Sequence, residues 1–305
     1  MDQGKHIGSS FDAFLDERGT WEETHRVARE RVARWQRDGA GDGASNEERL
    51  AGGNVSDAVV RIGDTVRKPA TAATPAIAAF LAHLDAAGFA GAPRTLGIDE
   101  QGRHVVEFVP GEIALAGLPL TLPELGRVGR LIRDLHDASA TFVPPADAAW
   151  DVAIPPDRAE LICHHDLAPW NLVRDGERWV FIDWDGSGPG SRLWDLAYAA
   201  HGFIPLGPGG DPAHDAPRLR ALVDGYGLDV GQRRALPPLI VAHTRAMSDL
   251  LEDGARTGRQ PWARLHAEGH ADHWGPAAEY IERNLSTFGD ALVGDDSIDG
   301  AAGAG

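Results

Sequence analysis

The order of hydrophobic and polar residues divides the chain into regions with different secondary structure. In residues 1–50, the stretch TWEETHRVARERVARWQRDG predicts a helix, because Thr20 stands as an N-cap with Glu23 three residues later. The Gly/Ser-rich stretch GAGDGASNEE that follows is typical of a flexible linker. Residues 1–50 are therefore predicted to form a helical extension that a linker joins to the rest of the chain.

Residues 51–112 have a pattern rich in strands. The stretch GGNVSDAVVRIGDTVRKP contains two β-rich runs joined by the turn Gly63–Asp64, which predicts a hairpin. The stretch TPAIAAFLAHLDAAGF repeats apolar residues at helical spacing and places Pro75 directly after Thr74, which predicts a helix. HVVEFVPGE then predicts a strand that ends in a Pro-Gly turn. A small β-rich domain with one helix is expected here.

The remainder of the chain is mostly helical in pattern. Residues 113–288 show helical periodicity, interrupted where the strand-like stretches LIC and LVR flank the polar stretch HHDLAPWN. The end, residues 289–305, is small and acidic and is predicted to be disordered. With 305 residues, the chain is long enough for two domains that each bury a core.

Composition indicates a globular protein, with 43% hydrophobic and 25% charged residues. The chain contains no run of 18 apolar residues, and its N-terminus lacks the apolar core of a secretory signal. We therefore expect neither a membrane span nor a membrane partner. The one cysteine, Cys163, excludes an intrachain disulfide and favours a cytoplasmic location.

The charge balance is strongly acidic, with 29 basic and 46 acidic residues and a formal net charge of −17 at pH 7. This balance disfavours nucleic-acid partners, which require a basic surface. The acid would attract a cationic small molecule, or it would serve only solubility, and the sequence leaves both alternatives open. In the helical region, the candidates to face such a substrate are Asp215, Asp224, Asp249, Glu252 and Asp253.

The stretch HHDLAPWN contains the pattern H-x-D-x-x-x-x-N, formed by His164, Asp166 and Asn171. Asp183 follows 17 residues after Asp166, at the end of the apolar strand WVFI. This arrangement suits phosphoryl transfer, in which one carboxylate receives the proton of an attacking hydroxyl while a carboxamide and a second carboxylate hold magnesium. Asp185 competes with Asp183 for the metal, but the end of the strand favours Asp183.

The residues HHDLAPWNLV and FIDWDGSGPGSRLWDLAYAA resemble the core of the aminoglycoside phosphotransferase family, over roughly residues 50 to 285. Members have a protein-kinase-like fold and phosphorylate small-molecule hydroxyls with a nucleoside triphosphate. The resemblance implies an α+β fold with a β-rich N-lobe (51–112) and a helical C-lobe (113–288), with ATP or GTP and Mg²⁺ as cofactors. It implies Asp166 as catalytic base, Asn171 and Asp183 as magnesium ligands, and His164 as a brace of the loop. His165 stands where many members have glycine.

The N-lobe is expected to bind the nucleotide. Lys68 is the candidate for the strand lysine that contacts phosphate, although Arg67 aligns equally well, and strand alternation lets only one of them face the phosphates. The loop over the phosphates contains only Gly52 and Gly53. The stretch VVEFVPGE resembles the family's hinge, and the resemblance implies that adenine meets the carbonyl of Glu107 and the amide of Val109, on either side of Phe108.

Two departures from the family pattern support alternatives. The predicted helix at residues 74–89 lacks the glutamate that usually pairs with the lysine, and its nearest polar candidates are His83 and Asp85. A catalytically weak or dead nucleotide-binding or scaffolding protein of the same fold is therefore the rival hypothesis. Residues 5–23 resemble the start of some small bacterial antitoxin-type regulators, which implies only a protein contact through residues 1–50. Asp195, in RLWDLA, is expected to cap a helix or brace the loop.

Overall fold

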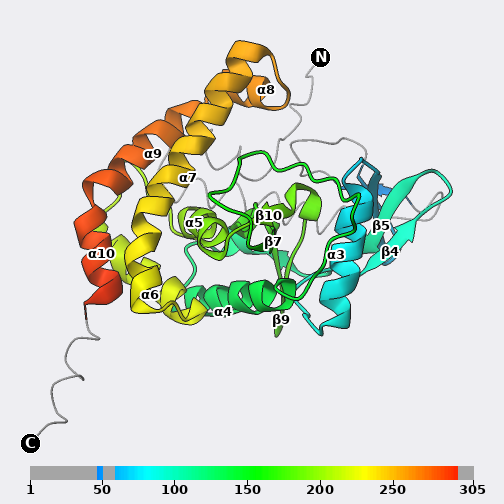
Figure 1. Ribbon diagram of the computed structural model, residues 1–305, viewed down its shortest axis with the longest axis horizontal. Helices are drawn as coiled ribbons and strands as arrows, with labels where there is room; N and C mark the ends of the chain where they lie inside the picture. Colours follow the sequence, from blue (N-terminus) through cyan, green and yellow to red (C-terminus); the bar gives the residue numbers. More distant parts are fainter. Residues whose placement is uncertain (1–46, 51–58, 295–305) are drawn as a thin grey trace, which may run out of the picture.

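In the computed structural model, the described residues, 47–50 and 59–294, form two lobes of different composition (Figure 1). The smaller lobe is a five-stranded antiparallel sheet in the order β1-β2-β3-β5-β4, with helix α3 against it. Its elements are β1 (Glu48–Arg49), β2 (Val60–Ile62), β3 (Thr65–Pro69), α3 (Thr74–Ala86), β4 (Thr95–Ile98) and β5 (Arg103–Glu107). The hairpin, the helix and the strand expected before the Pro-Gly turn are all present.

Local sequence explains the hairpin and the helix of this lobe. Gly63 adopts a positive φ of 59° in the turn between β2 and β3, a conformation that favours glycine. Helix α3 has proline in its first turn and buries Ile77, Phe80, Leu81 and Leu84, which recur at helical spacing. This apolar face belongs to the main core, which includes Val106 of β5. The helix is therefore fixed against the sheet.

Both outer boundaries of the two lobes differ from the prediction. Residues 48–49 pair with β2 as strand β1, although the sequence placed them in a linker, because Glu48 lies opposite Arg61 and forms an ion pair with it. Helix α10 (Leu285–Val293) continues past residue 288, because it buries Phe288 and Leu292. The predicted N-terminal helix, Gly52, Gly53 and residues 295–305 lie outside the described residues.

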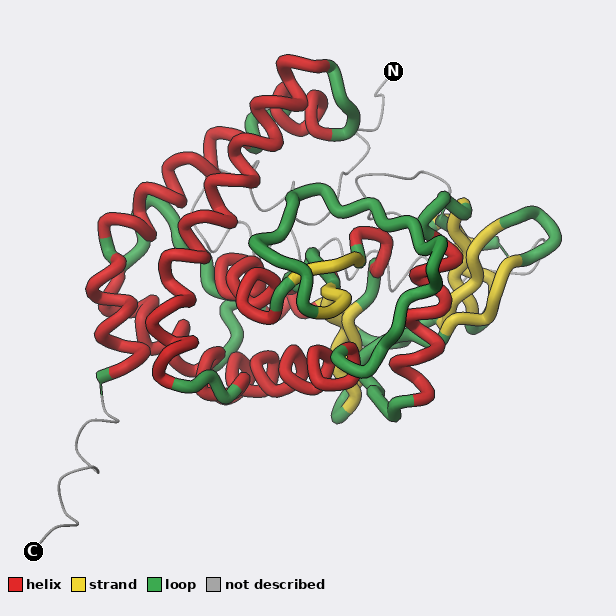
Figure 2. Tube along the Cα trace, in the orientation of Figure 1, coloured by secondary structure: helices red, strands yellow, loops and turns green. Residues whose placement is uncertain are grey.

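The larger lobe contains the helices α4 to α10, with α7 and α9 lying side by side along one flank (Figures 1 and 2). Helix α4 begins at a capping box formed by Thr121 and Glu124. Its Gly129 lies so close to the Leu222 carbonyl of α6 that a side chain would not fit. The further bounds are α4 (Leu122–Ser139), α5 (Arg192–Phe203), α6 (Pro212–Tyr226), α7 (Val230–Thr257), α8 (Trp262–Ala267) and α9 (Ala271–Arg283).

Short strands in the larger lobe bring the polar loop and the interlobe connection together. They are β6 (Glu112–Ile113), β7 (Leu161–Cys163), β8 (Leu172–Asp175), β9 (Arg178–Phe181) and β10 (Gly188–Gly190). Strand β7 pairs with β10, and β8 lies between β6 and β9. The stretch 164–171 therefore connects two sheets beside the end of β9.

The connection between the lobes requires a glycine. Gly111 has a φ of 131°, and a Cβ there would lie 2.4 Å from the carbonyl oxygen of Arg174. The backbone of the connection can therefore pass against β8 only without a side chain. None of the helices in the described part of the chain is both long and apolar enough to span a membrane.

Candidate active site

The loop between β7 and β8 is fixed by buried hydrogen bonds at His164. Its Nε2 lies 3.1 Å from the carbonyl oxygen of Ile182, and its Nδ1 accepts the amide of Asp166 at 3.2 Å. Burial lowers the pKa of His164 to about 4, so the ring is neutral and carries its proton on Nε2. The ring also packs edge-on against Trp184. His164 thus ties the loop of Asp166 to the segment that contains Asp183.

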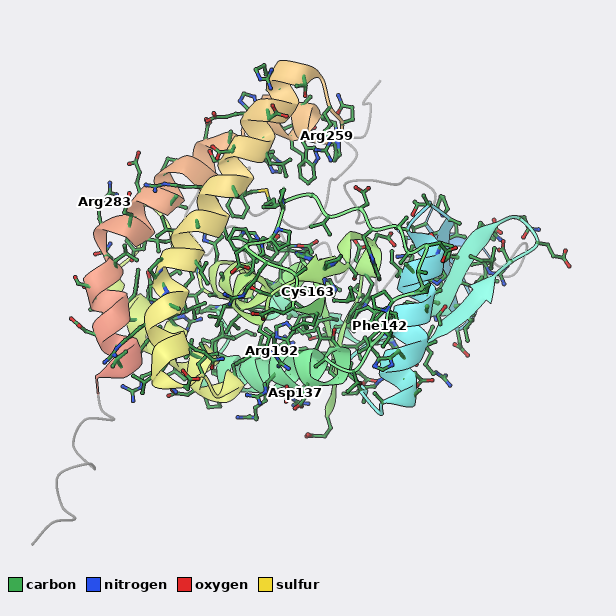
Figure 3. The ribbon with its side chains drawn as sticks, in the orientation of Figure 1. Asp137, Phe142, Cys163, Arg192, Arg259 and Arg283 are labelled. Atoms are coloured by element: carbon green, nitrogen blue, oxygen red, sulfur yellow. The ribbon has the colours of Figure 1, made fainter. Side chains whose placement is uncertain are left out.

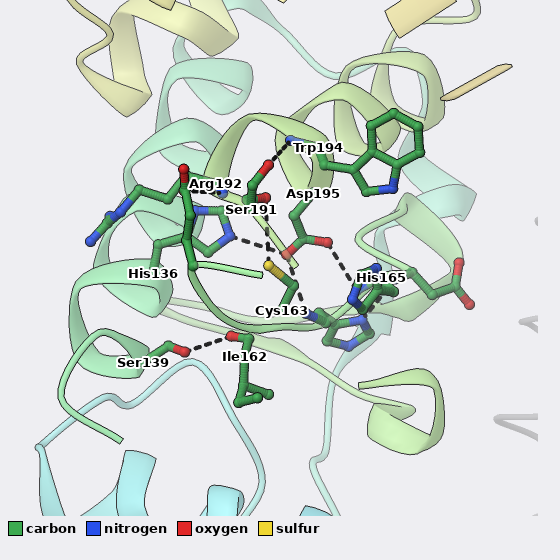
Figure 4. Close-up of polar contacts among 12 residues, drawn as sticks. His136, Ser139, Ile162, Cys163, His165, Ser191, Arg192, Trp194 and Asp195 are labelled. Carbon is green, nitrogen blue, oxygen red and sulfur yellow. Dashed lines mark hydrogen bonds and ion pairs between the residues drawn. The ribbon is translucent and has the colours of Figure 1, made fainter. Parts of the chain in front are cut away.

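Asp195, near the start of α5, holds the backbone of the same loop (Figure 4). Its carboxylate accepts the amides of His164 at 3.2 Å and His165 at 2.9 Å, and it lies 3.1 Å from Nε2 of His136. Although burial acts in the opposite direction, the hydrogen bond from His136 and nearby histidines hold the pKa of Asp195 well below its usual range. The expected bracing role matches this geometry.

The side chains of His136, Cys163 and Asp195 are buried together, and each offers one potential metal-ligand atom. These three atoms lie within 4.8 Å of one another, close enough to bind one metal ion (Cys163 is labelled in Figure 3). Each side chain already has a hydrogen-bond partner: Nδ1 of His136 lies 2.8 Å from the Tyr226 hydroxyl, and the thiol points to the Ser191 carbonyl. Burial raises the pKa of the Cys163 thiol well above its ordinary value, so the thiol keeps its proton and can donate it to the Ser191 carbonyl. This cluster is a hydrogen-bond network that fixes the loop.

The Asp166 carboxylate is held at both oxygens. The hydroxyl of Tyr198 donates to Oδ1 at 2.8 Å, and Nδ2 of Asn171 donates to Oδ2 at 2.7 Å. Burial, together with the charge of Asp183, raises the pKa of Asp166 to about 6, although the hydrogen bonds from Tyr198, Asn171 and Trp170 act in the opposite direction. An acidic group with a pKa near neutrality can accept a proton during catalysis.

Asp183 lies two residues after β9 with a positive φ of 61°. In the described residues, the only other non-glycine residue with positive φ is His165, and such backbone strain is typical of functional sites. Asp183 is solvent-exposed, yet burial among surrounding atoms raises its pKa, against the charge of Lys68.

Asn171 and Asp183 fit a magnesium ion by their chemistry. The Asn171 amide nitrogen donates to Asp166, so the carboxamide oxygen is the side-chain atom with lone pairs for a metal ion. The backbone of the two segments is joined, because the Ile182 amide donates to the Asn171 carbonyl at 2.8 Å. Asp183 adds a carboxylate. The nearby negative charge of Asp185 destabilises the ionised form of this carboxylate. Hard oxygen ligands in a site with two aspartates and one lysine suit this cation.

Lys68 and Arg67 point to opposite sides of β3, as strand alternation requires. Nζ of Lys68 lies 2.5 Å from Oδ1 of Asp185, next to Asp183, whereas Arg67 forms an ion pair with Asp99 at 3.5 Å. The structure therefore brings Lys68 to the acidic loop and keeps Arg67 away from it. Opposite Lys68 on β5 lies the buried ring of His104.

The helix residues considered as replacements for the missing glutamate do not approach Lys68. His83 lies 3.0 Å from the carbonyl oxygen of Ala138 and 5.2 Å from the ring of Phe142, in the larger lobe. Asp85 is exposed. Asp185, 117 residues away in sequence, supplies the carboxylate instead.

The proposed hinge links the lobes through side chains. Glu107 forms an ion pair with Arg178 of β9 at 2.9 Å, and this guanidinium holds the pKa of Glu107 below its ordinary value. The Phe108 amide donates to the Asp64 carbonyl, and Arg61 covers the Phe108 ring. Val109 is buried against Val173 and Val180. These contacts fix the backbone at which adenine is expected.

Sequence reasoning missed Tyr198 and the pairing role of Asp185. Tyr198 follows Asp195 by three residues, so both lie on one face of α5. That spacing could have placed Tyr198 beside the loop once Asp195 was expected to brace it. For Asp185, the sequence offered only its closeness to Asp183.

Most of the acids expected to face a substrate are already engaged. Asp215 is buried and accepts the Tyr280 hydroxyl at 2.7 Å, Asp224 forms an ion pair with Arg233, and Asp253 forms one with Arg256. Asp249 and Glu252 are exposed on α7. The acidic surface available to an acceptor is therefore smaller than the composition suggests.

Buried neutral histidines make the fold sensitive to acid. Burial lowers the pKa of His164 to about 4 and of His243 to about 3, and it lowers that of His201 well below its ordinary value. The unfolded chain takes up protons below about pH 6.5 while the folded chain does not, so stability falls as the pH drops from there. We expect a loss of roughly 1–2 kcal/mol per histidine at pH 5, measurable by thermal unfolding at pH 5 and 7.

The variant His243→Phe provides the control for this prediction. The His243 ring packs 4.8 Å from Trp194 and 5.0 Å from Tyr198, a setting that accepts a phenyl ring. The variant should lose less stability than the wild type between pH 7 and pH 5. Equal melting temperatures of the wild type at both pH values would show that these histidines do not govern its acid response.

The fold and the loop together define a kinase-like phosphotransferase. The family model described as the phosphotransferase enzyme family (APH) matches residues 38–149 and 146–236, so the chain belongs to this family of enzymes. The family expected from the motif is confirmed. The trifolitoxin immunity protein of Rhizobium leguminosarum bv. trifolii is 31% identical over 235 residues, which cover 71% of this chain and 87% of that protein.

Solved structures confirm the two-lobed α+β fold. A choline/ethanolamine kinase family protein from Mesorhizobium loti matches with a TM-score of 0.56 at 19% identity, over 87% of this chain and 99% of that chain. An amicoumacin kinase in complex with AMP-PNP, Ca²⁺ and Ami matches with a TM-score of 0.55 at 12% identity, over 87% of this chain and 96% of that chain. At these identities the similarity concerns the fold alone.

Proposed function

We propose that this phosphotransferase moves the γ-phosphate of ATP or GTP, with Mg²⁺, to a hydroxyl of a small molecule. The observation that carries the proposal is the geometry around Asp166, whose carboxylate is held by Asn171 and Tyr198 beside Asp183 and Lys68. A base, two oxygen ligands and a cation converge there, which is the set that phosphoryl transfer requires. The nucleotide and divalent ion in the structure of the amicoumacin kinase support it.

In the proposed reaction, the acceptor oxygen forms a bond to the γ-phosphorus and the bond to the bridging oxygen of the nucleotide breaks. Asp166 receives the proton of the acceptor hydroxyl, and His164 keeps its loop in place. Asn171 and Asp183 would hold Mg²⁺, which neutralises phosphate charge. Lys68 would contact phosphate from its place beside Asp185, whereas Arg67 stays with Asp99.

The nucleotide base is proposed to lie at the interlobe connection, between the Glu107 carbonyl and the Val109 amide. The ion pair of Glu107 with Arg178 and the buried position of Val109 support a preformed backbone there. Residues 1–50 lie mostly outside the described residues, so a protein contact through them stays a prediction, as does a cytoplasmic location.

For the acceptor, we propose a hydroxylated amine. The net charge of −17 and the exposed acids Asp249 and Glu252 support a cationic ligand. The names of the immunity protein and the amicoumacin kinase support a toxin or antibiotic as the acceptor class. The competing explanation is that the acids only keep the helices solvated.

A screen for nucleotide consumption tests both cofactor and acceptor. ATP and GTP are each offered with aminoglycosides, amino alcohols and neutral polyols, and the consumption by Asp166→Asn is subtracted. We expect turnover with an amine acceptor and a several-fold fall in kcat/KM as the salt concentration rises from 0.01 to about 0.5 M, because salt screens the attraction. A neutral or anionic best acceptor with salt-independent kcat/KM would contradict the cationic acceptor.

The rival function is nucleotide binding without catalysis. The absence of a helix glutamate within α3 favours it, because this residue usually orients the lysine. The ion pair between Lys68 and Asp185 counts against it, since the lysine has a carboxylate partner. Calorimetric binding of ATP measured beside turnover separates the two functions: binding with no turnover for any acceptor would favour the rival.

A further inference from the structure

The chain contains three tyrosines, and one of them contacts the proposed base directly. The Tyr198 hydroxyl donates to Oδ1 of Asp166 at 2.8 Å. The Tyr198 side chain is buried, and burial raises its pKa well above the ordinary value, so the phenol is neutral and acts as a donor. Nothing in the proposed transfer chemistry consumes this hydroxyl.

Packing fixes the ring that carries the hydroxyl. Trp170 of the loop meets it edge-on with the ring centroids 6.5 Å apart, and His243 of α7 lies 5.0 Å away. The same apolar cluster contains Ala168 of the loop, together with Leu251 and Trp274. Because this packing fixes the ring, the Tyr198 hydroxyl stays in one place. It can therefore hold the Asp166 carboxylate in one orientation.

Helix α5 consequently contacts the loop at two points, its backbone and the side chain of Asp166. Asp195 accepts the backbone amides of His164 and His165, while Tyr198, three residues later, holds the side chain of Asp166. An ionised carboxylate offers about four lone-pair sites. Tyr198, Asn171 and Trp170 donate to Asp166, which leaves about one site for the acceptor hydroxyl.

We propose that Tyr198 is a positioning residue for the transfer reaction, whose hydroxyl sets the plane of the Asp166 carboxylate so that one oxygen lone pair faces the acceptor. This inference rests on the proposed role of Asp166 as the base. Without the hydroxyl, Oδ1 loses its fixed donor and the carboxylate turns about its Cβ–Cγ bond. The acceptor then meets the base in the productive geometry only part of the time.

The test compares Tyr198→Phe with Tyr280→Phe. Tyr280 provides a matched control, because its buried hydroxyl donates to Oδ2 of Asp215 at 2.7 Å in another part of the larger lobe. Each substitution removes one buried tyrosine–aspartate hydrogen bond and keeps the ring. Hydrolysis of MgATP, with water as the acceptor, is the probe of turnover, and crystal structures of both variants report the orientation of Asp166.

We expect Tyr198→Phe to lower kcat roughly tenfold while the KM for MgATP changes less than twofold, and Tyr280→Phe to keep both constants. Both variants should lose similar thermal stability. In the background of Asp166→Asn, Tyr198→Phe should have no further effect on kcat, because the group that it positions is gone. The Asp166 carboxylate should be rotated or spread over two orientations in Tyr198→Phe alone.

Equal losses of kcat in the two tyrosine variants, or an unmoved carboxylate with unchanged kcat in Tyr198→Phe, would overturn the positioning role. A further loss from Tyr198→Phe in the Asp166→Asn background would also overturn it. A wild type without turnover contradicts the proposed function itself, and this outcome is distinct from an active wild type with an equally active Tyr198→Phe.

Discussion

Replacement of Asp166 by asparagine will reduce phosphoryl transfer by roughly 10²–10⁴-fold and leave nucleotide binding within about twofold of the wild type. Asparagine keeps the shape of the side chain but cannot take the proton of the acceptor hydroxyl. The nucleotide is expected to contact Lys68, Asp183 and the hinge instead. Acceptor-dependent ADP release measures the first effect, and calorimetry with MgATP measures the second.

Asp215→Asn is the matched control for this substitution. Asp215 is also a buried aspartate that accepts a tyrosine hydroxyl, but it lies at the start of α6. Its replacement should cost stability and leave the turnover per folded molecule unchanged. Wild-type turnover in Asp166→Asn would show that the proton goes elsewhere.

The sequence predicted those parts of the site that follow from spacing along one segment. The pattern of His164, Asp166 and Asn171, followed by Asp183, placed the loop before the end of β9 correctly, because strands on either side fix its ends. The hairpin of β2 and β3 followed from the turn at Gly63, and alternation along β3 correctly put Lys68 and Arg67 on opposite faces.

The contacts that depend on the relative placement of distant segments could not be predicted. The partner of Lys68 is Asp185, and no local pattern connects a strand of one lobe to a turn of the other. The direction of His83 depends on how α3 is rotated, and this rotation is fixed by Phe80 and His83 packing on Phe142, in the loop after α4. The helix sequence alone therefore could not show which residue pairs with Lys68 in place of the missing glutamate.

The two-residue strand and the role of the surface charges both depend on contacts that the sequence does not show. Strand β1 has two residues, too few for an alternating pattern, and pairing with β2 alone defines it. The excess of acid left two interpretations open, a surface for a cationic substrate and solubility alone. In the fold, Asp224 forms an ion pair with Arg233, and Asp215 accepts the Tyr280 hydroxyl. The net charge of a sequence does not tell which charges remain free in the fold.

Substitutions of Asp183 and Asp185 will separate the proposed metal ligand from the partner of Lys68. Asp183→Asn removes a carboxylate beside Asn171, so we expect the affinity for ATP to fall roughly 10–100-fold in the presence of Mg²⁺ and to change little in EDTA. Asp185→Asn frees Lys68 from its ion pair, so its effect should be similar with and without the metal. Calorimetric titration of ATP under both conditions measures these differences.

The two variants form a matched pair, because each replaces one exposed aspartate of the same turn by its isosteric amide. A structural role common to both would change binding equally, whatever the metal concentration. If the Mg²⁺-dependent part of the affinity disappears in Asp185→Asn and persists in Asp183→Asn, Asp185 is the ligand and Asp183 is not. The strained backbone at Asp183, with its φ of 61°, favours the opposite result, because such a conformation is kept where a side chain must point to one place.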